Sequence, residues 1–241
     1  MTEPPESAAV VPALPAFPIT RIAWERTVRL VSSARLRDPV LRKLVGRDFM
    51  ADLAEIEAAT SGRLTIQHHG AADLPVEQLV AGPAHAAFIN AAFSYWRPAE
   101  LNRFNGPGRG AWYAALALET CIAEVAFHLT RELERTNDFN AVVDYAEMFA
   151  SFAGEFADLR DLRPAPECLS ADPVVGYPAG NHLADTVRHR GLNGIVYPSV
   201  RHGAGTCLVA LWPAAVQSVA QGGIVRLTWS GTPDYEWAAL A

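Results

Sequence analysis

The stretch from Arg103 to Leu129 contains a glycine-rich loop, a short strand and a long helix in direct succession. The loop spans 105–110, and the apolar run 111–115 after it predicts a strand. The helix is indicated by apolar residues at steps of three and four, which lie on one helical face: Leu118, Ile122, Val125, Leu129 and Leu133. Arg103 precedes the loop, and Arg109 stands near its end. A loop held between such elements is a natural place to bind an anionic ligand.

A tail and a helical segment are expected before this unit. Residues 1–19 are acidic and rich in proline, with no basic start before an apolar core, so a flexible tail rather than a signal peptide is expected. Residues 20–79 form a predicted helical extension, with helical patterns over Thr20–Val45 and Phe49–Ala59. The first pattern is broken at Asp38-Pro39, where a second helix can begin.

From Pro75 onward, short apolar runs alternate with glycine and proline, a pattern typical of strands and turns. Four runs predict strands: 141–145, 194–197, 207–211 and 224–229. A helix is predicted over Asn181–Arg190, with Asn181 as its cap and Gly191 just past its end. The expected organisation is a mostly helical N-terminal part, an α+β domain over 80–228 and a C-terminal tail over 229–241.

Composition narrows the classes of function. The 241 residues carry a formal net charge of −6, which argues against direct nucleic-acid binding, since nucleic-acid binders are normally basic. The three cysteines, Cys121, Cys168 and Cys207, are widely separated and lack CxxC or zinc-site spacing, so a reduced, cytoplasmic protein is expected. No apolar run reaches membrane-spanning length, and neither a membrane nor a metal partner is expected.

Glu124 has both a structural and a functional interpretation. It shares a polar stripe of the predicted helix with His128, Arg131 and Arg135, as expected of a solvated face with pairing between residues four apart. Its immediate neighbours are small or apolar, however, and its helix follows the predicted strand that carries Tyr113. Glu124 can therefore equally face a cleft beside that strand.

The residues around the glycine-rich loop also allow two interpretations. Arg103 can pair with a carboxylate such as Glu100, or its planar guanidinium can hold a phosphate at two points. Arg109 stands among glycines, which favours a solvated side chain, and Asn105 before a glycine is typical of a turn. Tyr113 on a short buried strand is expected in the core, with its hydroxyl bonded to one partner.

A further group of candidates lies in the segment Tyr197–His202, directly after a predicted strand. Ser199 stands where that strand ends, a common location for binding groups. No GxSxG pattern surrounds Ser199, so a nucleophile is not expected. Ser199 is interpreted either as a hydrogen-bond donor to a ligand or as a simple turn serine, and Arg201 is a second binding candidate.

Two blocks of the sequence resemble the RES domain. They read RFN…G…WYAAL…ETCIAEVAFH and, later, GLNGIVYPSVRHGAGTCLVAL. The family is named after an arginine, a glutamate and a serine, which fall here on Arg103, Glu124 and Ser199. The resemblance covers about residues 80–228. For the arginine of the family's early strand, Arg21 and Arg97 are both candidates.

The resemblance implies a fold, an activity and a partner. RES proteins are toxins of Xre–RES toxin–antitoxin pairs, with a fold similar to the ADP-ribosyltransferase domain of diphtheria-like toxins. They bind NAD+ and break its nicotinamide–ribose bond. The ADP-ribose passes to phosphate or water in some members, and at least one branch modifies a protein. An Xre-type antitoxin, NAD+ and an acceptor protein are therefore the expected partners.

The candidate residues suit this chemistry. Cleavage of an N-glycosidic bond passes through an oxocarbenium-like ribose, which a carboxylate such as Glu124 can stabilise. Arg103 can hold the pyrophosphate, and Tyr113 and Ser199 can contact the nicotinamide-ribose end, with Asn105 and Arg201 as further contacts. Two other functions fit the sequence less well: a non-catalytic nucleotide-binding module and an RNase toxin, which the net charge disfavours.

Overall fold

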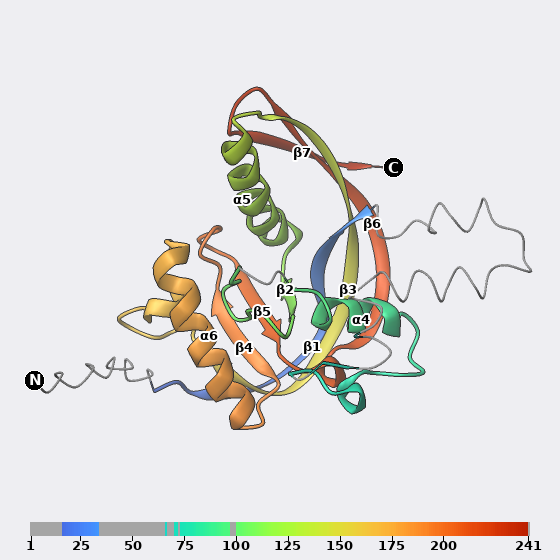
Figure 1. Ribbon diagram of the computed structural model, residues 1–241, viewed down its shortest axis with the longest axis vertical. Coiled ribbons are helices and arrows are strands. Elements are labelled where there is room, and N and C mark those ends of the chain that lie inside the picture. The colour runs from blue at the N-terminus through green and yellow to red at the C-terminus, as the bar shows by residue number, and fades with distance from the viewer. Residues whose placement is uncertain (1–15, 34–65, 67–69, 72, 97–99, 241) are drawn as a thin grey trace, which may run out of the picture.

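The computed structural model describes residues 16–33, 66, 70–71, 73–96 and 100–240. Within this part, a mixed sheet is flanked by three α-helices and three short 3-10 helices (Figure 1). The strands are β1 (Ile19–Ser32), β2 (Trp112–Ala115), β3 (Asn140–Asp158), β4 (Gly194–Pro198), β5 (Thr206–Ala210), β6 (Gln217–Ser230) and β7 (Tyr235–Leu240). The helices are η3 (Val76–Gln78), α4 (Ala86–Phe93), α5 (Leu118–Thr136), η4 (Glu167–Leu169), α6 (Pro173–His189) and η5 (Pro213–Ala215). The α+β class predicted from the sequence is confirmed.

The sheet has the order β1-β2-β5-β4-β3-β6-β7, and β1 also pairs with β3. Strand β1 is antiparallel to β3 along most of its length, from Ile19 opposite Ala157 to Ser32 opposite Tyr145. Strands β3 and β4 form a parallel pair. Strand β1 pairs with both β2 and β3, so β1, β2, β5, β4 and β3 form a closed ring of paired strands. Strands β6 and β7 continue the sheet beyond β3.

Alternating residues of the central strands point to two separate cores, as the period of two in a strand requires. One core includes Ile195 and Val209 and packs against α5 and α6. The other includes Val196 and Leu208 and packs against Ile89 and Phe93 of α4. In Figure 1, α6 covers β4 and α5 stands beyond β2, while α4 lies on the opposite side of β2.

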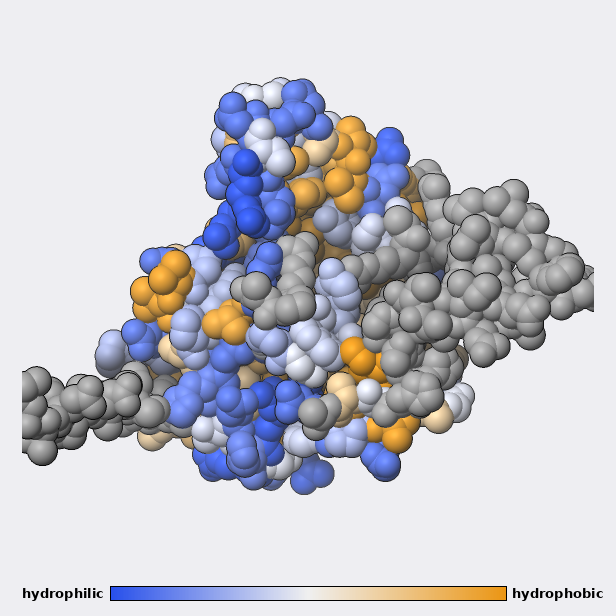
Figure 2. Space-filling view, viewed as in Figure 1, coloured by the Kyte–Doolittle hydropathy of each residue, from blue (hydrophilic) through white to orange (hydrophobic). Residues whose placement is uncertain are grey.

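Helix α5 forms as its sequence predicts. Ile122 is buried, and the other members of the predicted apolar stripe pack against the same core: Leu118, Val125, Leu129 and Leu133. The helix ends at Thr136, and the left-handed backbone of the following Asn137 lets its amide close the last turn on Leu133 and Glu134. The outer face of α5 is hydrophilic, as Figure 2 shows.

The prediction of a helix at the start of residues 20–79 is wrong for the described part. Residues 19–32 form β1, which is part of the central sheet. A register shift between Trp24 and Thr27 interrupts the alternation. Ile22 therefore packs in the second core, whereas Val28 and Leu30, an even number of residues further on, pack in the first. Such a bulge conceals a strand from a test based on periodicity.

The predicted helix over Asn181–Arg190 is the second half of α6. The helix begins at Pro173, with the Asp172 side chain accepting a hydrogen bond from the Val174 amide. Proline suits the first position of a helix, so Pro173 marks a start rather than a break. Gly191 follows the helix end with a φ of 70°, as predicted.

The four predicted strands all lie within β3, β4, β5 and β6, although Leu211 falls just past the end of β5. The predicted C-terminal tail, 229–241, contains the end of β6 and all of β7. The patterns at Asp38-Pro39 and Phe49–Ala59, and the candidate Arg97, lie outside the described residues. In the part of the chain that the structure describes, no helix is long and apolar enough to cross a membrane.

Candidate active site

A cavity of about 240 Å³ opens between α5, β2 and the loop that precedes β2. Its walls come from six parts of the chain that are distant in sequence: β1, the 102–103 segment, β2, α5, α6 and β4–β5. Charged and polar lining residues are Arg29, Asn102, Arg103, Tyr113, Glu124, His128, Tyr177 and Tyr197. The cavity therefore contains three of the sequence candidates, Arg103, Tyr113 and Glu124.

The carboxylate of Glu124 is held by the loop after β4. The Ser199 hydroxyl donates a hydrogen bond to Glu124 Oε1 at 2.7 Å, across 75 residues of sequence. The Cys207 thiol donates a longer bond, 3.9 Å, to the same oxygen. Glu124 is half-buried, so its carboxylate is oriented by the protein while still facing the cavity.

Ser199 is buried and directed at Glu124, and the cavity walls do not include it. Its oxygen accepts hydrogen bonds from the backbone amides of Arg201, at 3.1 Å, and His202, at 3.0 Å. These bonds form a serine turn of the kind that short polar side chains make with their own backbone. The single hydroxyl proton is thereby aimed at the glutamate.

Two of the three cysteines line the cavity, Cys121 and Cys207. Burial raises the pKa of the Cys121 thiol to about 12 and raises that of Cys207 further, with the Glu124 charge adding to the effect. Both side chains are therefore thiols at neutral pH. They supply a weakly polar wall behind the glutamate.

Arg103 is buried beneath the start of α6. One terminal nitrogen donates to the carbonyl oxygens of Cys168, at 2.6 Å, and Ser170, at 3.0 Å. The guanidinium carbon lies 5.4 Å from the centre of the Tyr177 ring, within the range of a cation–π contact. The side chain is thus fixed by backbone carbonyls and an aromatic ring while it lines the cavity.

Two glycines of α6 make this position of Arg103 available. A Cβ atom on Gly180 would lie 1.9 Å from the Arg103 carbonyl oxygen, and one on Gly176 would lie 3.0 Å from its guanidinium. Side chains at these positions would push the arginine segment away from the helix. The glycines of α6 therefore serve close packing against Arg103.

Tyr113 and Asn105 form one network at the bottom of the loop. The Tyr113 hydroxyl donates to Asn105 Oδ1 at 2.9 Å and accepts from the Phe104 amide at 2.9 Å. Asn105 is buried and donates in turn to the Arg109 carbonyl at 3.1 Å. The hydroxyl proton of Tyr113 is already used, so the ring is the part that Tyr113 presents to the cavity.

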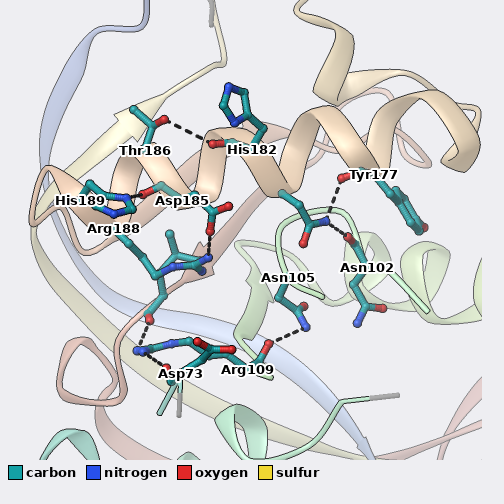
Figure 3. Close-up of polar contacts among 12 residues, drawn as sticks. Asp73, Asn102, Asn105, Arg109, Tyr177, His182, Asp185, Thr186, Arg188 and His189 are labelled. Carbon is teal, nitrogen blue, oxygen red and sulfur yellow. Dashed lines mark hydrogen bonds and ion pairs between the residues drawn. The ribbon is translucent and has the colours of Figure 1, made fainter. Parts of the chain in front are cut away.

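Arg109 is buried, which contradicts the expectation of a solvated side chain. Its guanidinium donates to the Asp73 carbonyl, to the Gln78 side chain and to the Leu211 carbonyl. Figure 3 shows it beside Asp73, under the network that contains Asn105. Glycine neighbours suggested exposure, but this arginine anchors the loop to β5 and to the segment before α4.

Arg201 faces a different hollow from Glu124. Its guanidinium stacks 3.3 Å from the centre of the Phe127 ring and donates to the Ala171 carbonyl at 2.8 Å. It lines a second hollow of about 610 Å³ together with Phe127 and Arg131. Arg201 is therefore not among the residues that line the cavity with Arg103, although its guanidinium interacts with Tyr177, which does line it.

Arg29 of β1 is a cavity residue that the sequence patterns missed. It is half-buried, donates to the Tyr113 carbonyl at 3.2 Å and lies over the Trp112 ring at 5.0 Å. The candidate Arg21, on the same strand, is exposed and does not line the cavity. The β-branched residues in 27–31 are typical of a strand, and predicting a strand there would have located Arg29.

A larger groove of about 1090 Å³ shares a wall with the cavity. The residues common to both are Asn102, Val125, His128 and Tyr177. The cavity alone is smaller than most ligand sites, which typically span about 300–1,000 Å³. The adjoining groove extends the space that is open to a ligand.

An arginine, a glutamate and a serine from three separate blocks thus gather around one cavity. The family model of the RES domain matches residues 77–230, which is more than half of the chain. The chain therefore belongs to the RES-domain family. The matched region starts at η3 and ends with β6, and it leaves out β1.

The chain is also distantly similar to a solved structure. The toxin–antitoxin complex MbcT–MbcA of M. tuberculosis contains a chain with 14% identity and a TM-score of 0.42, aligned over 86% of this chain and 87% of that chain. Comparison with curated proteins gives no significant sequence match.

Proposed function

We propose that this protein is the toxin component of a toxin–antitoxin pair and that it cleaves the nicotinamide–ribose bond of NAD+. The observation that carries the proposal is the Glu124 carboxylate, oriented by Ser199 and facing a cavity that Arg103 also lines. Membership of the RES-domain family supports the same reaction. No metal is part of the proposal.

Glu124 is the catalytic residue in this mechanism. As the bond between the ribose and the nicotinamide nitrogen breaks, the electron pair leaves with nicotinamide, and positive charge develops on the ribose. A carboxylate beside that ribose stabilises the charge more in the transition state than in the bound substrate. The pyridinium nitrogen of NAD+ is already cationic, so nicotinamide departs without a general acid.

Arg103 and Arg29 are proposed to bind the pyrophosphate. Both line the cavity, and both are held by backbone carbonyls that fix the direction of the guanidinium group. An arginine in a fixed position is well suited to phosphate because its planar group donates at two points. The Tyr113 ring, which also lines the cavity, is proposed to contact the nicotinamide-ribose end.

The acceptor of ADP-ribose is proposed to be phosphate, water or a protein side chain, and the inhibiting partner an Xre-type antitoxin. The proposed setting is the cytoplasm, where NAD+ is present and cysteines remain reduced. The cavity lacks a second acidic residue beside Glu124 among its lining side chains in the described part of the chain. An acceptor that needs little activation fits such a site best.

The test is incubation of the purified protein with NAD+, followed by chromatography for free nicotinamide and mass spectrometry for ADP-ribose. Release of nicotinamide together with ADP-ribose on phosphate, on water or on a protein supports the proposal and names the acceptor. NAD+ that binds, shown by calorimetry, but stays intact would identify a non-catalytic nucleotide-binding module instead.

A further inference from the structure

The loop between β4 and β5 contacts α5 at a second point besides Glu124. Thr120 is fully buried on α5, and its hydroxyl oxygen shares a hydrogen bond with His202 Nδ1 at 2.9 Å. Thr120 lies one helical turn before Glu124, so both residues project from the same face of α5. The loop is therefore joined to two successive turns of the helix.

Four residues, Thr120, His202, Ser199 and Glu124, are connected by hydrogen bonds that begin and end on α5. From α5, Thr120 contacts His202, whose backbone amide donates to the Ser199 hydroxyl oxygen at 3.0 Å. Ser199 donates to Glu124 at 2.7 Å and so returns to α5. The position of His202 thus determines where one of the two amides that orient the Ser199 hydroxyl is placed.

Local geometry shows that the contact between Thr120 and the loop is tightly packed. A Cβ atom on Gly205 would lie 2.5 Å from the Thr120 hydroxyl oxygen and 3.1 Å from His202 Nδ1. The loop closes on itself through bonds of 2.8 Å from the Ser199 amide to the Gly205 carbonyl and from the Gly205 amide to the His202 carbonyl. Glycine at this position lets the loop approach the helix closely enough for the contact to form.

We propose that Thr120 and His202 are positioning residues for the reaction at Glu124. They hold the loop so that the Ser199 hydroxyl is directed at the Glu124 carboxylate, and they act through that pair rather than on the substrate. The inference rests on the proposed function. It extends the site beyond the cavity walls, since neither Thr120 nor His202 lines the cavity.

The test compares three variants of the full-length protein with the wild type. Thr120→Val removes the hydroxyl but keeps the branched shape, and Thr120→Ser restores the hydroxyl. Thr130→Val is the matched control, because Thr130 lies on α5 and accepts a hydrogen bond from Trp229 instead of from the loop. Each variant is measured for nicotinamide release and for hydrogen–deuterium exchange of the backbone amides in 199–205.

Thr120→Val is expected to speed exchange in 199–205 and to lower kcat about tenfold or more with little change in KM, since a small displacement of a catalytic group has effects of this order. Thr120→Ser is expected to recover most of kcat, and Thr130→Val to resemble the wild type in both measurements. In a Ser199→Ala background, adding Thr120→Val should lower kcat little further, because both changes act on the same series of hydrogen bonds.

Unchanged exchange or unchanged kcat in Thr120→Val would overturn the inference. Equal, additive losses from Thr120→Val in the wild-type and Ser199→Ala backgrounds would overturn it too. Absence of nicotinamide release from the wild-type protein would overturn the proposed function itself. The exchange measurement would then still decide whether Thr120 holds the loop.

Discussion

The Ser199 hydroxyl has one proton, and its hydrogen bond directs that proton toward the Glu124 carboxylate. Ser199→Ala should therefore lower kcat more than KM, since it releases the carboxylate and not a substrate contact. A hydrogen bond to a charged group contributes about 1.5–3 kcal/mol, so a loss of about tenfold or more is expected. Steady-state kinetics of nicotinamide release measure this, and a pure KM effect would instead indicate direct contact of Ser199 with NAD+.

Arg103→Lys tests the two-point grip on phosphate. Lysine keeps the positive charge but lacks the planar guanidinium group. It cannot donate to the Cys168 and Ser170 carbonyls and to a phosphate at the same time in the geometry of arginine. We expect KM for NAD+ to rise by about tenfold, the effect of losing one charged hydrogen bond. Arg163→Lys, at an exposed arginine on the loop before η4, is the control, and equal kinetics for both variants would contradict the phosphate role.

The thiols offer a residue-scale test that does not depend on catalysis. Burial raises the pKa of Cys121 to about 12 and that of Cys168 to about 11, and it raises that of Cys207 as well. Because the thiolate is the reactive form, all three cysteines should react slowly with a thiol reagent at pH 8 in the folded protein and rapidly in denaturant. Fast labelling of the native protein would show that the cavity is more open than described.

Among contacts between elements, the one between α6 and the Arg103 segment leaves the least room for an added side chain. Gly180→Ala would place a Cβ atom 1.9 Å from the Arg103 carbonyl oxygen, so helix and segment must separate. Overpacking of this kind costs about 1–3 kcal/mol, and Tm and nicotinamide release should both fall. Gly203→Ala is the control, because a Cβ atom at Gly203 has no atom within 4 Å. An unchanged Tm for Gly180→Ala would contradict the close packing.

Elements with strong local signals were predictable from the sequence. The runs in β4 and β5 are apolar, short and bounded by glycine or proline, and α5 keeps its apolar spacing over several turns. Strand β1 was not predictable because a bulge breaks its alternation. The start of α6 was missed because Pro173 and Pro178 resemble breaks, although a proline fits the first turn of a helix.

The candidate site was only partly accessible from the sequence. The resemblance to a family pointed to Arg103, Glu124 and Ser199, which the fold brings around one cavity. Arg29 and Thr120 gave no comparable signal, because their roles come from contacts across more than eighty residues of sequence. The opposite case is Arg109, whose glycine-rich neighbours suggested exposure although the side chain is buried and makes three hydrogen bonds.

In the whole molecule, β1 lies before the matched region in sequence but is part of the same sheet. It lies along β3, supplies Val28 and Leu30 to the core and brings Arg29 to the cavity. A truncation that starts at Pro75 should therefore fail to fold, while one that starts at Ala16 keeps every described residue and should stay folded. Circular dichroism and thermal melts measure this, and a stable, cooperative domain from Pro75 onward would contradict the role of β1.

In the proposed reaction, Glu124 stabilises the ribose of NAD+ as nicotinamide leaves. This role is measured by the rate of nicotinamide release by Glu124→Gln, with Glu119→Gln as the control, because Glu119 is exposed on the same helix and lines neither the cavity nor the groove. Glutamine keeps the size of the side chain and removes its charge, so the rate should fall by about 10²-fold or more with the Tm little changed. Turnover of NAD+ by Glu124→Gln at a rate near that of the wild type would contradict the account.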